Sequence, residues 1–281
     1  MLVSMVETMG KAREEGYCVP ALTAQNEHCL HAVLDAAEEA NSPVILLQMY
    51  NATPDFQAYG QIARILGEKA KVPVSIILDH GAEFDHAIAA IRAGFTDIMI
   101  DRSSLPYQEN VAQVSELVKI AHAVGVGVEA ELGHVGEGLA GGDSGEGSGD
   151  SVFTDPDQAA QYVEQTGIDT LAVSIGTAHG AYKGVPKLQF ELLEKLRETV
   201  PVPLVLHGGS GSGDDNLRRA CSMGICKLNM AFDLYRGALD ALAATDLSVG
   251  SAAYGLYPVM ASGIKKAALH CIDLCGSANK A

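Results

Sequence analysis

The chain has 281 residues, of which 48% are hydrophobic and 19% are charged, and its formal net charge at pH 7 is −16. This composition is typical of a globular protein with enough apolar side chains for a closed core. The excess of acidic groups argues against nucleic acid or an anionic membrane surface as a partner, because both would be repelled.

The N-terminal stretch is not typical of a targeting sequence. Its first 16 residues include three glutamates and lack the apolar centre of a secretory signal peptide. No apolar run in the sequence approaches the ~20 residues that a transmembrane helix requires. We therefore expect a cytoplasmic protein that does not contact a membrane.

Short apolar runs rich in β-branched residues alternate with amphipathic stretches along the whole chain. This alternation predicts repeated β-α units around a parallel sheet. Strands are expected at residues 19–24, 43–48, 74–79, 98–101, 127–131, 170–175, 203–207 and 225–229. Eight such units predict an α/β fold in which residues 1–281 form a single (β/α)8 TIM barrel. A doubly wound open sheet is the alternative.

The expected helices fall between these strands. In the stretch 110–123, one face carries the apolar residues Val111, Val114, Leu117, Val118 and Ala121. Asp155 and Pro156 predict a helix start, because Asp caps a helix and Pro fits its first position. Beyond the eighth strand, residues 258–275 predict an extra C-terminal helix.

Residues 133–151 break the alternation. They are rich in Gly, Ser and acidic residues, with almost no apolar side chains after Leu139, so they cannot pack as a regular element. We expect a mobile Gly-rich, acidic loop after the fifth strand. Long loops at this end of a barrel often cover active sites, which favours that role over an inert connection.

The six cysteines form no Cys-x-x-Cys pair and no compact disulfide framework. Most are expected to be buried thiols. Cys271 and Cys275 are one helical turn apart and could be half of a metal site, but apolar core positions are the favoured interpretation.

Three histidines, each in a Gly-rich segment, follow short apolar runs: His80, His179 and His207. Catalytic groups of a TIM barrel lie where strands end, so these imidazoles are expected to converge on one rim. Three neutral nitrogens bind a divalent metal and leave one position open to substrate. The pattern therefore predicts a catalytic metal site, and three unrelated hydrogen-bonded histidines are the disfavoured alternative.

Further polar residues stand at predicted strand ends, namely Asp79, Asp101, Glu131 and Asn229. Any one of them could be a capping residue, but together on one rim they favour a site. The histidines expected in helices, away from strand ends, are His28, His31, His86, His122 and His270. His134 begins the predicted loop, and a loop role is favoured there over metal ligation.

Two Gly-rich segments predict a phosphate cradle. Residues 180–184 offer backbone N–H groups and the cation of Lys183, and residues 208–211 add the hydroxyl of Ser210. Helices are predicted after both segments, and helix N-termini favour anions. Barrels frequently hold phosphate in the loops after strands seven and eight, where Ser210 and Asn229 fall.

Five segments resemble, in the same order, the class II metal-dependent ketose-bisphosphate aldolases, and in particular the fructose- and tagatose-bisphosphate aldolases. They are LDHG at 78–81, MIDRS at 99–103, VEAELG at 128–133, IGTAHGAYKG at 175–184 and LHGGSG at 206–211. The resemblance implies a lyase of carbohydrate metabolism, such as glycolysis. It would reversibly cleave a ketose (bis)phosphate to dihydroxyacetone phosphate and an aldehyde through a metal-stabilised enediolate. A homodimer or homotetramer is also implied.

By position, the resemblance implies a role for each matching residue. The implied ligands of a catalytic Zn²⁺ are His80, His179 and His207. The acidic positions of an alternative site, or of a second divalent or monovalent cation, are Asp101 and Glu131. The proton-transferring aspartate corresponds to Asp79, and the candidates for a loop acid that exchanges the proton at the carbanion carbon are Glu137, Asp143 and Glu146. The residues matched to dihydroxyacetone phosphate are Gly180, Lys183, Gly208, Ser210 and Asn229.

Several substrate-side positions depart from the family pattern. Thr23 lies where the family usually has a Phe-Asn pair, Phe232 replaces a phosphate-holding Thr or Ser, and residues 251–256 lack the arginine of an Asp-Pro-Arg stretch. The missing cation predicts a distal substrate group that is uncharged or contacted by another residue such as Arg102. Two other functions stay open, a non-catalytic accessory subunit of an aldolase complex and a metal-dependent sugar-phosphate epimerase.

Overall fold

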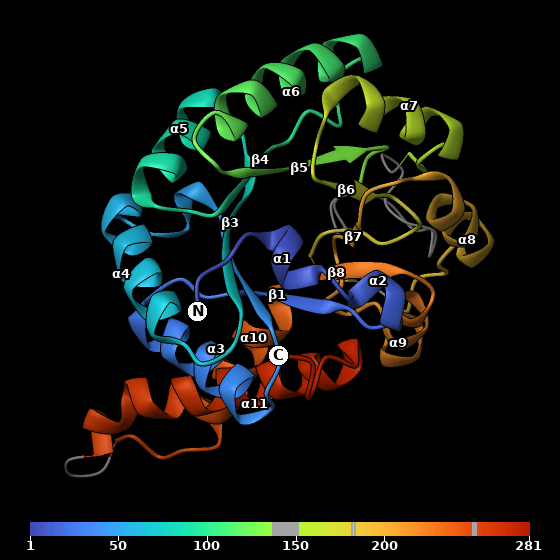
Figure 1. Cartoon of the computed structure of the whole chain (residues 1–281). Helices are drawn as coiled ribbons and strands as arrows, with labels where there is room; N and C mark the ends of the chain where they lie inside the picture. The colour runs from blue at the N-terminus through green and yellow to red at the C-terminus, as the bar shows by residue number, and fades with distance from the viewer. Residues whose placement is uncertain (137–151, 181, 183, 249–251) are drawn as a thin grey trace.

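Eight parallel strands form the centre of the molecule in a computed structural model that describes residues 1–136, 152–180, 182, 184–248 and 252–281. The strands are β1 Val19–Thr23, β2 Val44–Gln48, β3 Val74–Gly81, β4 Asp97–Ile100, β5 Gly127–Leu132, β6 Thr170–Val173, β7 Leu204–Leu206 and β8 Ile225–Met230. They pair in chain order, and β8 pairs with β1 to close the ring (Figure 1). The closed ring confirms the TIM barrel and excludes the open sheet.

Helices lie around the barrel, and the first two of the chain lie across one of its ends (Figure 1). They are α1 Met5–Met9, α2 Ala12–Glu15, α3 Glu27–Glu39, α4 Phe56–Lys69, α5 Phe84–Ala93, α6 Tyr107–His122, α7 Pro156–Thr166, α8 Phe190–Thr199, α9 Asp214–Ser222, α10 Phe232–Ala243 and α11 Leu256–Cys275, with short 3₁₀ turns η1 Tyr50–Ala52 and η2 Ala252–Gly255. The Asp155 side chain accepts a hydrogen bond from the Gln158 N–H at 2.8 Å, which confirms the predicted start of α7. Within the described part of the chain, no helix combines the length and the apolar composition of a membrane span.

The end of β3 differs from the predicted end at residue 79. The strand continues to Gly81, and its register against β4 shifts between Leu78 and Gly81. Within this irregularity His80 has a φ of 46°, a left-handed conformation that side chains other than glycine rarely adopt. Such bulges occur next to active sites, where they redirect a side chain. The sequence does not reveal this bulge, because periodicity alone predicts a regular strand.

Buried apolar side chains form two groups. The larger group fills the space between the strands and the outer helices, and the smaller joins α1 and α2 to residues of β1, β2, β3 and β8. In the smaller group Met5 and Met9 are almost fully buried. The Met5 backbone N–H donates a hydrogen bond to the carboxylate of Asp97, at the start of β4, at 2.9 Å. The N-terminal helices therefore cover the N-terminal end of the barrel.

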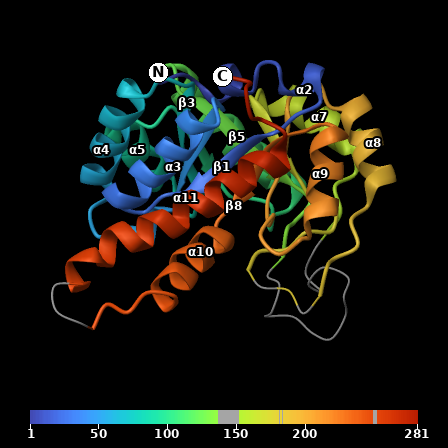
Figure 2. The ribbon, with the colours of Figure 1, turned by 90° about the horizontal axis from the view of Figure 1, so that it is seen from below.

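The last two helices, α10 and α11, lie side by side in both views (Figures 1 and 2). A Cβ added to Gly263 would stand 2.1 Å from the carbonyl oxygen of Gly237, so only glycine allows these backbones to approach so closely. The C-terminal helix was predicted, and it begins two residues earlier than expected, at Leu256. It returns the chain to the end of the barrel where the N-terminus lies (Figure 2).

Candidate metal centre and active site

Three histidines from different strand ends converge at the C-terminal end of the barrel. His80 lies in β3, His179 follows β6 and His207 follows β7. The ring centroid of His80 is 4.7 Å from that of His179 and 4.7 Å from that of His207. One ring nitrogen of each histidine lies within 4.8 Å of the other two. This spacing allows all three rings to bind one metal ion after small adjustments.

Several donor atoms here are buried without a hydrogen-bond partner. They are Nε2 of His80, Nδ1 of His207 and Oε2 of Glu131. His207 Nδ1 and Glu131 Oε2 are 3.0 Å apart but are not aligned for a hydrogen bond. Buried polar atoms without partners are uncommon and costly in folded proteins. A cation would satisfy all three atoms, so the residues present fit the predicted metal ion.

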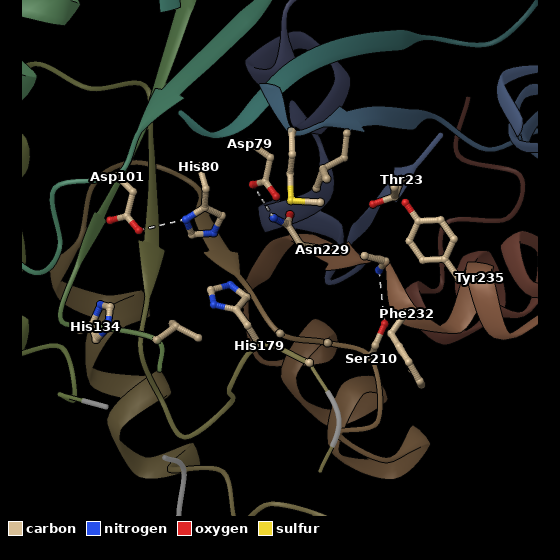
Figure 3. A pocket seen from close by; sticks show the side chains of 17 residues that line it. Thr23, Asp79, His80, Asp101, His134, His179, Ser210, Asn229, Phe232 and Tyr235 are labelled. Carbon is tan, nitrogen blue, oxygen red and sulfur yellow. Dashed lines mark hydrogen bonds and ion pairs between the residues drawn. The ribbon is translucent and has the colours of Figure 1, made fainter. Parts of the chain in front are cut away.

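Carboxylates hold the other nitrogen of two of these rings. Asp101 Oδ2 is 3.0 Å from His80 Nδ1, and Glu129 Oε1 is 2.8 Å from His207 Nε2. The dashed line between Asp101 and His80 in Figure 3 marks the first of these contacts. Metal-binding histidines are commonly oriented by a carboxylate in this way. Asp101 also forms, with His80 and Glu131, a second group of donor atoms within 4.8 Å of one another. The two acidic residues expected at an alternative cation site, Asp101 and Glu131, therefore lie together beside His80.

Sequence reasoning missed the two residues that support His207 from inside the barrel. Lys227 of β8 is fully buried, and its ammonium group donates to both carboxylate oxygens of Glu129 at 2.8 Å. Two features of the sequence could have indicated these residues. One signal is a lysine within the apolar run of β8, and the other is a glutamate two residues before Glu131, on the same side of β5. Neither signal identifies the partner, which is distant in sequence.

Burial and neighbouring charges shift the pKa values of the cluster. Burial lowers the pKa of His179, and His80 and His207 lower it further, to about 4. Burial also acts to lower the pKa of His207, but its hydrogen bond with Glu129 and the nearby charge of Glu131 raise it to about 10. His179 is therefore neutral at pH 7, whereas His207 has to release a proton before both its nitrogens can serve other partners.

A cavity of about 510 Å³ borders the cluster. The described residues that line it are Thr23, Leu47, Met49, Asp79, His80, Asp101, His134, Val135, His179, Gly180, Gly208, Gly209, Ser210, Asn229, Ala231, Phe232 and Tyr235. Asp79 is 6% exposed, and the side-chain amide of Asn229 donates to its Oδ1 at 3.1 Å (Figure 3). The cavity therefore presents the oriented carboxylate of Asp79 beside the histidines, and its volume suits a small ligand.

The predicted phosphate residues that the structure describes lie along this cavity. Gly208 has a φ of 66°, and a Cβ there would stand 2.3 Å from the Ala178 carbonyl oxygen, so the loop requires glycine. The Ser210 hydroxyl oxygen accepts hydrogen bonds from the N–H groups of Ala231 and Asp233 at 3.3 Å. Ser210 thus joins the loop after β7 to the start of α10.

Tyr182, which sequence reasoning also missed, connects the two Gly-rich segments. Its hydroxyl lies 2.7 Å from the Ala178 carbonyl oxygen and 2.9 Å from the Gly208 carbonyl oxygen. It also accepts hydrogen bonds from the Ala178 N–H and the Ser212 hydroxyl. A tyrosine in the Gly-rich segment 180–184 indicates that its hydroxyl could form hydrogen bonds. The sequence of the segment does not show which groups the hydroxyl contacts.

Part of the predicted site lies outside the described residues. The residues concerned are Glu137, Asp143, Glu146 and Lys183, together with most of the predicted loop at 133–151. The described start of that loop is attached to the site, because the His179 backbone N–H donates to the Gly136 carbonyl oxygen at 2.8 Å.

Arg102 does not replace the missing cation. Its guanidinium group donates to the carbonyl oxygens of Ala82 and Asp101 at 2.8 Å and also contacts the side chain of Gln113. It is absent from the described lining of the cavity, which contains no arginine or lysine.

The other histidines lie outside the three-histidine group, as expected. Those in helices are His28 and His31 in α3, His86 in α5, His122 in α6 and His270 in α11. His134 borders the cavity, where its Nδ1 is 2.8 Å from the Ser103 hydroxyl oxygen and 4.0 Å from Glu131 Oε1. It lies next to the cluster without belonging to the three-histidine group.

Comparisons with known proteins agree with this geometry. The family described as "Fructose-bisphosphate aldolase class-II" matches residues 3–280. The "Probable fructose-bisphosphate aldolase" of Bacillus subtilis is 42% identical over 242 residues, which cover 82% of this chain and 81% of that protein. The "D-tagatose-1,6-bisphosphate aldolase subunit GatY" of Klebsiella oxytoca is 40% identical over 247 residues, which cover 86% and 85%. The crystal structure of the YdjI aldolase from Escherichia coli K12 has a TM-score of 0.89 and 35% identity over 100% of both chains.

Proposed function

The chain belongs to the class-II fructose-bisphosphate aldolase family and is a metal-dependent aldehyde-lyase, and from this premise we propose that it uses Zn²⁺ to cleave a ketose phosphate reversibly into dihydroxyacetone phosphate and an aldehyde. The observation that carries the proposal is the convergence of His80, His179 and His207, the first two of which line the same cavity as Asp79. Imidazole nitrogens in a three-ligand set with an open position suit catalytic zinc.

The metal site and Asp79 have complementary tasks in this proposal. The bound ion supplies Lewis-acid stabilisation of the negative charge that develops on the donor when its carbon–carbon bond breaks. Asp79 takes the proton of the C4 hydroxyl during cleavage and returns it during condensation. Asn229 keeps the Asp79 carboxylate in place, because it donates to Oδ1 and leaves Oδ2 for the substrate. Asp101 and Glu129 orient the rings of His80 and His207.

The donor's phosphate is assigned to the loops that follow β6 and β7. Gly180, Gly208 and Ser210 border the cavity there, and Tyr182 holds the two loops together. Glycine permits close approach of the backbone to a phosphate, and backbone N–H groups and hydroxyls are its usual neutral ligands. Lys183, in the same segment as Gly180 and Tyr182, is also proposed to bind the phosphate.

The far end of the sugar is assigned to the wall formed by β1 and β2. Thr23, Leu47 and Met49 line the cavity there and carry no charge. A phosphate bound against such a wall would lose its hydration without gaining an ionic partner, which is unfavourable. We therefore propose a ketose monophosphate substrate, from which cleavage releases an uncharged aldehyde.

A condensation screen tests this assignment. Zinc-loaded protein is offered dihydroxyacetone phosphate or dihydroxyacetone, each with glyceraldehyde, glycolaldehyde or glyceraldehyde 3-phosphate, and products are identified by mass spectrometry. The expected result is carbon–carbon bond formation that requires the phosphorylated donor and proceeds at least as well with the uncharged aldehydes. If neither donor gives a condensation product, the proposal is wrong. Interconversion of sugars without bond cleavage would instead support the epimerase.

Self-association is the proposed quaternary arrangement, as a homodimer or homotetramer. Large apolar side chains are exposed in α10, η2 and α11, where Leu239, Tyr254 and Tyr257 are 60%, 88% and 54% exposed. Burial of exposed apolar side chains favours an interface between subunits. Light scattering after size-exclusion chromatography would show a monomer if this proposal is wrong. The expected cytoplasmic location also remains a prediction.

A further inference from the structure

Three buried cysteines meet at a second place in the molecule. Their sulfur atoms, one each from Cys18, Cys221 and Cys275, all lie within 4.8 Å of one another. Cys18 directly precedes β1, Cys221 lies in the last turn of α9 and Cys275 ends α11. The three residues are 0%, 3% and 1% exposed. All six cysteines are buried and free, where burial was predicted for most of them, and these three form a defined cluster that the sequence does not reveal.

The cluster is separate from the aldolase site. All eight strands are parallel, so residues that precede them lie at the opposite end of the barrel from residues that follow them. Cys18 precedes its strand, whereas His80 and His207 lie where theirs end. The Cys18 N–H donates to the Cys275 carbonyl oxygen at 2.9 Å, so the end of α11 is attached to the same face. Figure 2 shows both chain termini at this end of the barrel.

The donor set selects a thiophilic ion that accepts three ligands. Every donor atom in the group is sulfur, and soft thiolates select soft ions. A structural zinc site requires four ligands, but this group offers three. Three sulfurs bonded to a single ion at about 2.3 Å would stand at most about 4 Å apart. The observed separations of up to 4.8 Å therefore need only small side-chain movements.

The net charge of the bound complex distinguishes between the remaining candidate ions. The sulfurs are almost inaccessible to water, so a net charge on a bound complex would be poorly solvated. Cys221 and Cys275 also lie at the C-terminal ends of α9 and α11, where the helix dipole disfavours negative charge. Three thiolates leave two negative charges on a monovalent ion and one on a divalent ion, but none on a trivalent ion.

We propose that Cys18, Cys221 and Cys275 form a three-sulfur site for a trivalent thiophilic ion, of the class to which trivalent arsenic belongs. Arsenous acid, As(OH)₃, supplies the ion without any change of oxidation state. Three As–S bonds replace three As–O bonds, and each thiol proton leaves with one hydroxyl group as water. The product is neutral and connects the start of β1 with the ends of α9 and α11.

Native mass spectrometry with arsenite tests the site on the full-length protein. The wild type should gain one arsenic atom and lose three hydrogens, and its unfolding temperature should rise because the ion binds the folded state. Cys18→Ala and Cys221→Ala should lose this adduct. Cys271→Ala is the matched control, since Cys271 is equally buried in α11 but lies outside the cluster. It should keep the adduct.

Peptide mapping of the wild type keeps the test decisive if a variant fails to fold. Bound arsenic should protect Cys18, Cys221 and Cys275 from alkylation and leave the other three cysteines reactive after unfolding. The assignment is overturned by the absence of an adduct on native wild type, by the loss of only two hydrogens, or by protection of other cysteines. A Cu⁺ or Zn²⁺ adduct at these sulfurs without an arsenic adduct would overturn it as well. None of these outcomes depends on aldolase activity.

Discussion

Lys227 and Glu129 form a fully buried ion pair inside the barrel, with both carboxylate oxygens 2.8 Å from the ammonium nitrogen. The same carboxylate holds Nε2 of His207 at 2.8 Å. Burial acts to raise the pKa of Glu129, but Lys227 and His207 lower it to about 2. Glu129 is therefore ionised at pH 7, and its carboxylate lies behind a predicted metal ligand.

Removing the lysine charge should destabilise the protein strongly. Lys227→Met retains most of the side-chain volume but deprives the buried Glu129 of its cation, which should cost about 3–5 kcal/mol of unfolding free energy. Denaturant unfolding measures the loss. The control is Lys265→Met, whose 34%-exposed side chain pairs with Glu39 at 2.8 Å and should cost no more than about 1 kcal/mol. Equal losses of unfolding free energy in the two variants would show that the buried ion pair stabilises the protein no more than the exposed one.

The contact between Asp101 and His80 predicts a weaker metal site when it is removed. Asp101→Asn should reduce metal affinity about 10–100-fold, because the amide no longer orients the ring or increases its basicity. Competition with a chromophoric chelator measures the affinity. Asp169→Asn is the control, because Asp169 contacts His122 Nε2 at 2.8 Å in a similar pair away from the cavity. An unchanged affinity in Asp101→Asn would contradict the assigned role.

The role of Asp79 is separable from metal binding. Asp79→Asn preserves the shape of the side chain but removes the proton acceptor, so kcat for cleavage should fall about 10²–10⁴-fold. The metal content, measured by inductively coupled plasma mass spectrometry, should equal that of the wild type. A parallel loss of metal would identify Asp79 as a ligand rather than as a proton-transfer group.

The uncharged wall at β2 predicts a change of specificity when a cation is introduced. Met49 lines the cavity and is 40% exposed, so Met49→Arg can place a guanidinium group there. A charge-assisted hydrogen bond should increase kcat/KM for a phosphorylated aldehyde, relative to an uncharged one, about 10-fold or more. Ile62→Arg, on the exposed surface of α4, should leave this ratio unchanged. No shift with Met49→Arg would place the distal group elsewhere.

Asp97 predicts a pH dependence of stability that is separate from the metal site. Burial raises the pKa of its carboxyl group to about 7, whereas the unfolded chain has a value near 3.9. The folded state binds the proton more tightly, so this contribution is complete below about pH 4 and disappears as the pH rises through about 7. The difference corresponds to about 4 kcal/mol.

Asp97→Asn removes that titration and keeps an acceptor for the Met5 N–H. Denaturant unfolding at several pH values should show that the stability of the wild type, relative to the variant, declines between about pH 4 and pH 7. Parallel profiles of the two proteins would contradict the raised pKa. The comparison with the variant matters because Asp101, whose pKa His80 holds low, contributes the opposite slope.

The sequence determined the barrel and the residues at its open rim. Each β-α unit has its own local hydrophobic pattern, so eight units could be counted without knowledge of their contacts. Closure of parallel strands then places all their C-terminal ends together. For this reason His80, His179 and His207 could be predicted to meet, although the sequence did not reveal the bulge that gives His80 its positive φ.

Only the tertiary structure decided which residues support that rim and which meet elsewhere. Glu129 and Lys227 are 98 positions apart, and Cys18 lies far in sequence from Cys221 and Cys275. The partners of an inward-pointing lysine or of a buried thiol depend on strand register and on helix packing, which join distant segments. Periodicity shows that a side chain is buried, but it does not show which side chain it will contact. These contacts form only when the barrel closes and α11 packs against it.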